Sequence, residues 1–201
     1  MMRAICMALA LSALSCSSGS SSDMGGGQLS GVLQGAAFNP AEGGAVVIPP
    51  GNCDTSFYSA LILGFSATSG LCTYAQEAML CDARASDTIL TVGVVDVGTG
   101  AQSPVVPGTY TIGGSSSRQV TASFTKTDAT CTDSVPGTVT ASGTVTLSTI
   151  TASRVAGSVD LTFSDGSHAQ GSFDVALCSV TVDFCGVISG TCTCSTMSCC
   201  I

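Results

Sequence analysis

The chain of 201 residues is long enough for one ordinary domain, and its composition narrows the functions open to it. Only 9% of the residues are charged, against a typical ~25%, and the net charge is -8 with five Lys and Arg residues in all. Without clustered cations the chain lacks the footprint of a nucleic-acid-binding protein or of a polybasic lipid-binding segment. Hydrophobic residues make up 45% and occur in ordered alternation, which excludes a disordered low-complexity chain.

The first residues have the pattern of an export signal. Arg3 precedes an uncharged apolar stretch, 4–14, which is shorter than the ~20 residues needed to cross a bilayer and fits the hydrophobic region of a secretory signal. Ala13-Leu14-Ser15-Cys16 then resembles a bacterial lipobox, the site where a cysteine is lipidated and becomes the mature N-terminus. The usual lipobox has Leu three residues and Ala or Ser two residues before the cysteine; here these residues are Ala13 and Leu14. An ordinary cleaved signal followed by a chance cysteine is the alternative.

The residues after Cys16 favour an anchored protein. Residues 17–28, SSGSSSDMGGGQ, form a polar Ser/Gly-rich tether of the kind that separates a folded domain from its anchor. Ser17 lacks the acidic side chain that would resemble an inner-membrane retention signal, so we expect the outer membrane. The expected organisation is a lipoprotein signal peptide (1–15), the lipidated Cys16 with its tether (16–28), a β-rich domain (29–184) and a Cys-rich tail (185–201).

Hydrophobic patterning predicts strands and one helix along the domain. GGAVVIPPG (43–51) reads as a short strand closed by Pro49-Pro50-Gly51, and 56–66 reads as a central strand because both of its faces are apolar. The spacing of Thr73 and Gln76 is that of a capping box, which predicts a short helix from about Thr73 to Leu80. A second buried strand follows at 88–97, and the segments 109–114 and 118–126 read as a hairpin around Gly113-Gly114.

The clearest pattern lies between residues 138 and 177. Apolar residues alternate with period two over 138–150, 154–163 and 169–177, which predicts a β-meander with one buried face. Asp165-Gly166 supplies a favoured hairpin turn between the last two segments. The fold we expect is all-β: an antiparallel β-sandwich or partly closed β-barrel of roughly eight to ten strands, with one short helix and stabilising disulfides.

This region also resembles a known kind of protein. Residues 138–178, which end in Gly171-Ser172-Phe173 and then Cys178, are similar to the closing hairpins of uncharacterised lipoproteins abundant in myxobacteria and related deltaproteobacteria. Those lipoproteins combine a lipobox, a Ser/Gly tether and a β-rich domain. The resemblance implies this fold and an envelope location but no activity, and the sequence departs from the pattern after Cys178.

Residues for catalysis are scarce. His168 is the single histidine and lies beside the Asp165-Gly166 turn, where a solvated loop residue is the default; a Ser–His–Asp triad would need it. Asp160 and Asp174 occupy matching positions in two strands and form a conceivable acid pair, but both are out of phase with the apolar face and should point to solvent. No nucleophile elbow, zinc-protease motif, phosphate loop or calcium loop occurs, so we expect neither catalysis nor a cofactor.

Cysteine is the remaining candidate for chemistry. Removing Cys6 and Cys16 from the twelve cysteines leaves an even ten, which in an oxidising compartment favours structural disulfides. A helix between Cys72 and Cys81 would hold these two about 13 Å apart, too far for a mutual bond, so at least one must pair elsewhere, with Cys53 the nearest candidate. We expect Cys131–Cys178 to close the meander, and Cys199 and Cys200 to bond to different upstream cysteines. The candidate disulfide cysteines are Cys53, Cys72, Cys81, Cys131, Cys178, Cys185, Cys192, Cys194, Cys199 and Cys200.

Together these patterns predict a lipid-anchored envelope protein without catalytic activity. Its role would be structural or would consist of binding a protein or an envelope polymer, and its membrane contact would be the lipid on Cys16. A soft-metal lipoprotein that binds Cu or Zn through the tail is the first alternative, because Cys-x-Cys and Cys-Cys clusters suit such ions. A secreted hydrolase is the second.

Overall fold

The computed structural model describes residues 28–53, 56–78, 84–98, 102–114, 118–135 and 139–180. In these ranges ten strands and one helix occur, as predicted for an all-β chain with a short helix. The elements are β1 (Ser30–Leu33), β2 (Ala36–Phe38), β3 (Glu42–Cys53), β4 (Ser56–Ser66), α1 (Leu71–Ala78), β5 (Thr88–Gly98), β6 (Gly108–Thr111), β7 (Arg118–Lys126), β8 (Ala141–Ile150), β9 (Arg154–Phe163) and β10 (His168–Leu177).

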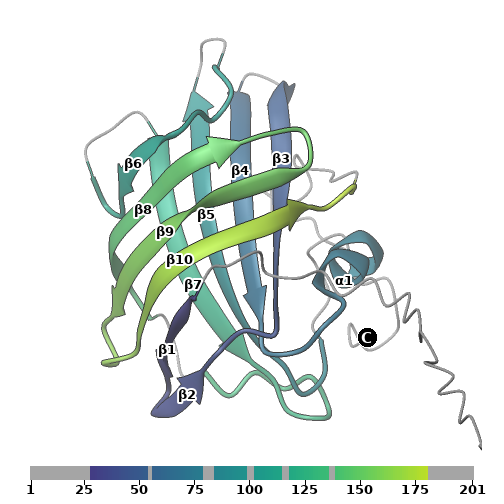
Figure 1. The fold of residues 1–201 in the computed structure, drawn as a ribbon, viewed down its shortest axis with the longest axis vertical. Helices are drawn as coiled ribbons and strands as arrows, with labels where there is room; N and C mark the ends of the chain where they lie inside the picture. The colour runs from purple at the N-terminus through teal and green to yellow at the C-terminus, as the bar shows by residue number, and fades with distance from the viewer. Residues whose placement is uncertain are drawn as a thin grey trace, which may run out of the picture.

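The strands form a single sheet that curls into a nearly closed barrel. Its strand order is β6-β8-β9-β10-β3-β4-β5-β7, with the β1–β2 hairpin attached to β10. In Figure 1 the strands β8, β9 and β10 cross in front of β3, β4, β5 and β7 at a steep angle, so the sheet has two facing layers. All the pairings are antiparallel except the one between β10 and β3, which joins the two layers.

Side chains bridge the gap between β6 and β7, the two ends of the strand order. Arg118 on β7 donates from Nη1 to the hydroxyl of Tyr110 on β6 at 3.1 Å, and its guanidinium carbon lies 6.0 Å from the centre of the same ring. Arg118 also pairs with the buried Asp96 of β5 at 3.5 Å. A single cation therefore connects both edges of the sheet.

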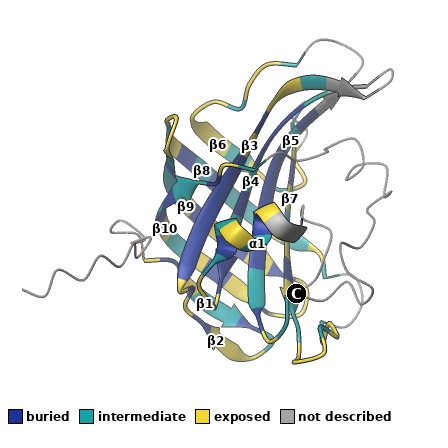
Figure 2. Cartoon of the chain, turned by 90° about the vertical axis from the view of Figure 1, so that its right-hand side faces the viewer, coloured by how far each residue is buried: buried dark blue, intermediate teal, exposed yellow. Residues whose placement is uncertain are grey.

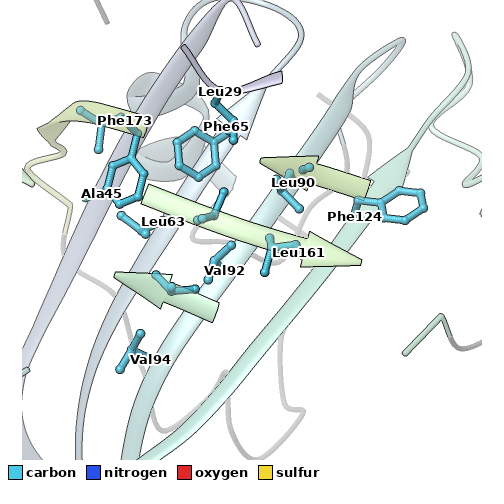
Figure 3. Packing of buried hydrophobic residues seen from close by; sticks show 14 of the residues in the cluster. Leu29, Ala45, Leu63, Phe65, Leu90, Val92, Val94, Phe124, Leu161 and Phe173 are labelled. Atoms are coloured by element: carbon cyan, nitrogen blue, oxygen red, sulfur yellow. The ribbon is translucent and has the colours of Figure 1, made fainter. Parts of the chain in front are cut away.

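The barrel interior is filled with aliphatic and aromatic side chains. Inward-facing residues of both layers meet there, among them Leu63, Val92 and Leu161 (Figure 3). Two edge-to-face aromatic pairs link the layers: Phe65 with Phe173 at 5.5 Å, and Phe124 with Phe163 at 5.0 Å. The interior is therefore a packed core.

The meander predicted between residues 138 and 177 is confirmed. β8 pairs with β9 and β9 with β10, and the alternate residues Val155, Val159, Leu161 and Phe163 of β9 are buried. The predicted Asp165-Gly166 turn closes the last hairpin, with Gly166 at φ +85° and the Phe163 amide donating to Ser167 at 2.8 Å. The buried and exposed stripes of these strands are visible in Figure 2.

The first long strand extends beyond its predicted end. We expected Pro49-Pro50-Gly51 to close it, but β3 continues to Cys53. Its pairing with β4 shifts between Ile48 and Gly51, where the two prolines lack the amide hydrogens that a regular ladder requires. The prolines thus produce a bulge, and the strand resumes after it.

The hairpin expected around Gly113-Gly114 does not form. β6 pairs with β8, and β7 pairs with β5, so the two segments lie at opposite ends of the strand order. The reason is burial: Val120 and Phe124 of β7 face the core beside β5, whereas Tyr110 of β6 packs against the core beside β8. Two short apolar segments close in sequence looked like partners, but each is buried better by a distant strand.

Among the residues described above, no helix has the length and apolar character needed to cross a membrane. The described helix α1 has eight residues and lies against β3 and β4 on the outside of the barrel (Figure 2).

Candidate functional site

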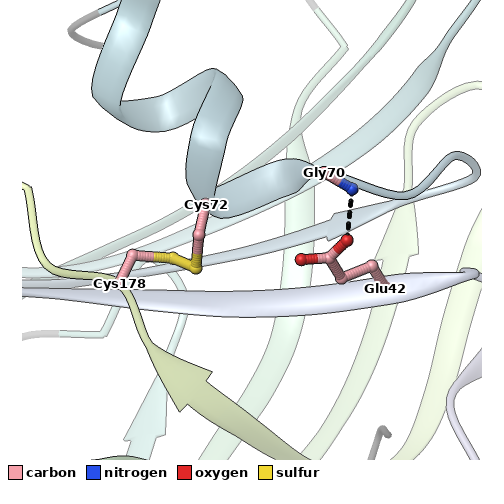
Figure 4. The surroundings of a disulfide bond; sticks show 4 residues. All are labelled: Glu42, Gly70, Cys72 and Cys178. Carbon is pink, nitrogen blue, oxygen red and sulfur yellow. Dashed lines mark hydrogen bonds between the residues drawn. A yellow bond between two sulfur atoms is a disulfide. The ribbon is translucent and has the colours of Figure 1, made fainter. Parts of the chain in front are cut away.

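A disulfide between Cys72 and Cys178 ties helix α1 to the end of strand β10. Their Cα atoms are 5.2 Å apart although 106 residues separate them in sequence (Figure 4). Cys72 lies in the first turn of α1, and Cys178 directly follows β10, where its amide donates to the Ala45 carbonyl at 2.7 Å. A Cβ atom on Gly44 would lie 2.8 Å from the Cys178 sulfur, so a glycine in β3 makes room for the bond.

This disulfide corrects one prediction. We expected Cys178 to pair with Cys131 across the meander, and that pairing is wrong because the Cys178 sulfur is bonded to Cys72. The expectation that Cys72 or Cys81 pairs outside the helical segment is confirmed for Cys72. The reason lies in the β10–β3 contact: it carries Cys178 to the outer side of β3, where α1 packs.

The start of helix α1 is set by a distant carboxylate. The helix begins at Leu71, and the Tyr74 amide donates to the Gly70 carbonyl at 2.9 Å, so Gly70 is its N-cap residue. Thr73, predicted as the cap, lies inside the first turn. The Gly70 amide donates to the carboxylate of Glu42, a buried residue of β3, and Gly70 has φ +87° (Figure 4). A negative charge at a helix N-terminus is favourable, and the turn conformation suits glycine.

A second buried acid, Asp87, organises the chain between α1 and β5. Ser66 donates to its Oδ2 at 2.6 Å, and the Thr88 amide donates to its Oδ1 at 2.7 Å. Arg84 reaches the same carboxylate at 3.5 Å, and its Nη2 donates to the Ser69 carbonyl. These partners satisfy the carboxylate with structural contacts, so this acid holds two loops together.

Cys131 is also disulfide-bonded. It lies in the loop after β7 with φ +59°, and its partner is neither Cys72 nor Cys178, which are bonded to each other. The loop is ordered by Asp128, whose carboxylate accepts hydrogen bonds from the side chain and amide of Thr130 and from the Thr132 amide. The hydrogen bond from the Thr130 side chain is the largest cause that lowers the pKa of Asp128 below its ordinary value.

The structure does not bring together the acid and base residues considered from the sequence. Asp160 is opposite Gln170 in the β9–β10 register, whereas Asp174 is opposite Ala156 four residues farther along. Asp160 is exposed, as predicted, and the half-buried Asp174 is paired with Arg154 at 2.7 Å. His168 is exposed at the start of β10, and within the described ranges it forms no ion pair.

One pocket lies beside the β1–β2 hairpin. Its volume is about 170 Å³, and its walls include Leu33, Phe38, Ala67, Thr88 and Lys126. Binding sites for organic ligands usually measure about 300–1,000 Å³, so this hollow is smaller than such a site. Among the described side chains, no group of three or more His, Cys, Asp or Glu residues could hold a metal ion.

Several predicted residues lie outside the part of the chain that the structure describes. These are the lipidation candidate Cys16, Cys81 and the tail cysteines Cys185, Cys192, Cys194, Cys199 and Cys200. Cys53 ends β3, but its side chain also lies outside the description. The sequence did not indicate the roles of Glu42, Ser66 and Asp87. A single acidic residue flanked by Gly or Ser does not show which loop its carboxylate will bind.

Comparison of the chain with protein-family models, with curated proteins and with solved structures gave no match.

Proposed function

We propose that this chain is a lipid-anchored, disulfide-stabilised protein of the cell envelope with a structural or partner-binding role and no catalysis. The observation that carries the proposal is the Cys72–Cys178 disulfide, together with the bonded state of Cys131. Disulfides of this kind persist in oxidising, extracytoplasmic compartments and are rare in the cytosol. The apolar segment 4–14 and Cys16 then supply the export signal and the anchor.

The absence of a catalytic role is supported by how the polar groups are used. The buried acids Glu42 and Asp87 bind the backbone or side chains of neighbouring loops, and Asp96 pairs with Arg118. The described side chains that face the barrel interior pack against one another and fill it. A partner, whether a protein or an envelope polymer, would accordingly bind on the outer surface.

Binding of a soft metal through the tail is the competing function. It requires the thiolates of Cys185, Cys192, Cys194, Cys199 and Cys200 to stay reduced, since a sulfur in a disulfide is not a thiolate ligand. The cross-links at Cys72, Cys131 and Cys178 favour an environment that oxidises the tail as well. We therefore place the tail cysteines in disulfides.

The anchor is tested by metabolic labelling with palmitate in a Gram-negative host, using the full chain. We expect label in the wild type and loss of both label and membrane association in Cys16→Ala. Cys6→Ala is the matched control: it removes the other N-terminal cysteine and should keep the label. A wild-type chain that is exported but never labelled, or a Cys16→Ala variant that stays labelled, would overturn the lipid anchor.

A further inference from the structure

The pocket beside the β1–β2 hairpin combines apolar walls with the single lysine of the chain. Lys126 lines it together with Leu33, Phe38 and Thr88. We propose that this pocket binds a small organic monocarboxylate, with the apolar body of the ligand inside the pocket and its carboxylate beside the ammonium group of Lys126. The inference goes beyond the structural or partner-binding role proposed above and does not depend on the lipid at Cys16.

The pocket lies at one end of the barrel, where several strands begin or end. β4 ends at Ser66, β5 begins at Thr88, and β7 ends at Lys126. Thr88 is directly opposite Lys126 in the β5–β7 register, and the Ala67 amide donates to the Thr88 carbonyl at 2.9 Å. In Figure 1 the β1–β2 hairpin lies at the same, lower end of the barrel. The hairpin therefore supplies the remaining wall of the pocket.

Hydrogen bonds at its turn hold this hairpin in place. The backbone amide of Gln34 donates to the Ser167 hydroxyl at 2.8 Å, and its side-chain amide donates to the Ser134 carbonyl at 3.1 Å. Ser134 is joined to the strand that bears the lysine, because its amide donates to the Lys126 carbonyl at 2.8 Å. The walls are thus held before a ligand arrives, which lowers the free-energy cost of binding.

Lys126 and Thr88 are polar residues that follow the strand phase of the core. On β7 the alternate residues Val120 and Phe124 are buried, and Lys126 continues this series as a half-buried residue. On β5 the half-buried Thr88 stands two residues before the buried Leu90. Because side chains two residues apart lie on the same face of a strand, both polar residues belong to the inward-facing series at the end of the core.

The positive charge of Lys126 is not neutralised by an ion pair within the described ranges, whereas three arginines each pair with an aspartate. Two acids near this end of the barrel are engaged otherwise. The Asp133 carboxylate accepts a hydrogen bond from the backbone amide of Lys126, and the buried Asp87 is paired with Arg84. A half-buried ammonium group beside apolar walls favours an anion, because a charge-assisted hydrogen bond is strengthened where water is partly excluded.

The volume of the pocket limits the size of the ligand. A cavity of about 150 Å³ can hold one benzene molecule, and this pocket measures about 170 Å³. The buried Leu33 and Phe38 form its inner wall, and Ala36, Ala37 and Asn39 are exposed at its rim. The apolar body of the ligand therefore contains about six carbon atoms, and its carboxylate lies toward the rim. Benzoate has this size and charge.

The single lysine gives a direct test by NMR. In the full chain labelled with ¹³C-lysine, one Hε–Cε signal reports on Lys126, and the backbone amides of Phe38 and Thr88 report on occupancy. Benzoate, added at constant ionic strength, should shift all three signals along a saturable curve with a dissociation constant in the millimolar range, as a ligand of this size allows. The absence of a saturable shift would overturn the binding site.

Neutral and cationic analogues of the same shape test the role of charge. Benzyl alcohol should bind the wild type about fivefold more weakly than benzoate, and benzylammonium should give no saturable shift, because its charge has the same sign as that of Lys126. Equal affinities for benzoate and benzyl alcohol would overturn the anion site. This comparison needs no variant, so it decides the question even if a substitution prevents folding.

A pair of charge-removing variants then tests the lysine itself. Lys126→Met keeps a long unbranched side chain and should weaken benzoate binding about fivefold, with little change for benzyl alcohol. Arg154→Gln is the matched control, because it removes one positive charge from outside the pocket and should leave the benzoate affinity unchanged. Unchanged affinity in Lys126→Met, or equal losses in both variants, would overturn the role of Lys126.

Discussion

The Cys72–Cys178 disulfide should make a large contribution to the free energy of unfolding. The bond closes a loop of 106 residues, for which the chain-entropy relation gives about 4.7 kcal/mol at 25 °C. We therefore expect the double variant Cys72→Ala/Cys178→Ala to lose about this amount of stability.

Urea denaturation of the oxidised wild type and of this variant measures the effect. The midpoint should fall, and the m-value should rise because the unfolded chain is less constrained and exposes more surface. Ser179→Ala is a matched control on an exposed neighbour of Cys178 and should change stability by less than about 0.5 kcal/mol. A loss below about 1 kcal/mol in the double variant would refute the argument that this bond restricts the unfolded chain.

Two further predictions concern packing and titration. Gly157→Ala should lower the free energy of unfolding, measured by urea denaturation, by about 1–3 kcal/mol or more, because a Cβ atom there would lie 2.0 Å from the Thr146 carbonyl oxygen. Gly108→Ala is the control and should be nearly neutral, because its Cβ atom would have no neighbour closer than 3.8 Å. Equal effects of the two substitutions would contradict the geometry. The pKa of Asp128 is lower in the folded than in the unfolded chain, so its stabilisation is present above the ordinary value of 3.8 and is lost as the pH falls through the folded value. In an NMR titration, Thr130→Ala should raise the pKa of Asp128, and no change would show that the Thr130 hydroxyl is not its main partner.

The sequence pattern predicted strands correctly wherever buried and exposed residues alternate along the strand. The meander of β8, β9 and β10 and the Asp165-Gly166 turn follow from alternation and turn chemistry alone. The position of β4 between two other strands follows as well, because residues apolar on both faces must be covered on both sides. These features depend on residues that are close together in the sequence, so the sequence pattern indicates them directly.

Apart from the bulge at Pro49-Pro50 in β3, the failures involve partners that are distant in sequence. The pairing of β6 with β8 and of β7 with β5 was missed because each segment is too short to indicate which edge will bury it. The start of α1 was misplaced because its cap is assisted by Glu42, 28 residues before Gly70. Cys178 was assigned to the wrong cysteine because its partner depends on the parallel β10–β3 contact, a pairing with no local signature.

The sequence predicted that the candidate site consists of disulfides, but it did not predict which cysteines pair. The cysteine count and the predicted export signal indicated disulfides, and the structure contains bonded cysteines at Cys72, Cys131 and Cys178. Which sulfur meets which depends on tertiary packing, since 106 residues lie between the two that are paired. The expected solvent exposure of Asp160 followed from strand phase alone and is confirmed.

The central claim is that this is an exported barrel held by disulfides, and the intact mass of the native protein before and after reduction tests it most directly. In the lipoprotein that we propose, Cys6 leaves with the signal and Cys16 carries the lipid, so ten of the twelve cysteines remain. We predict that reduction raises the mass by ten hydrogen atoms and that the unreduced protein has no thiol that reacts with an alkylating agent. Unchanged mass on reduction, with alkylated thiols or with retained copper or zinc, would contradict the account.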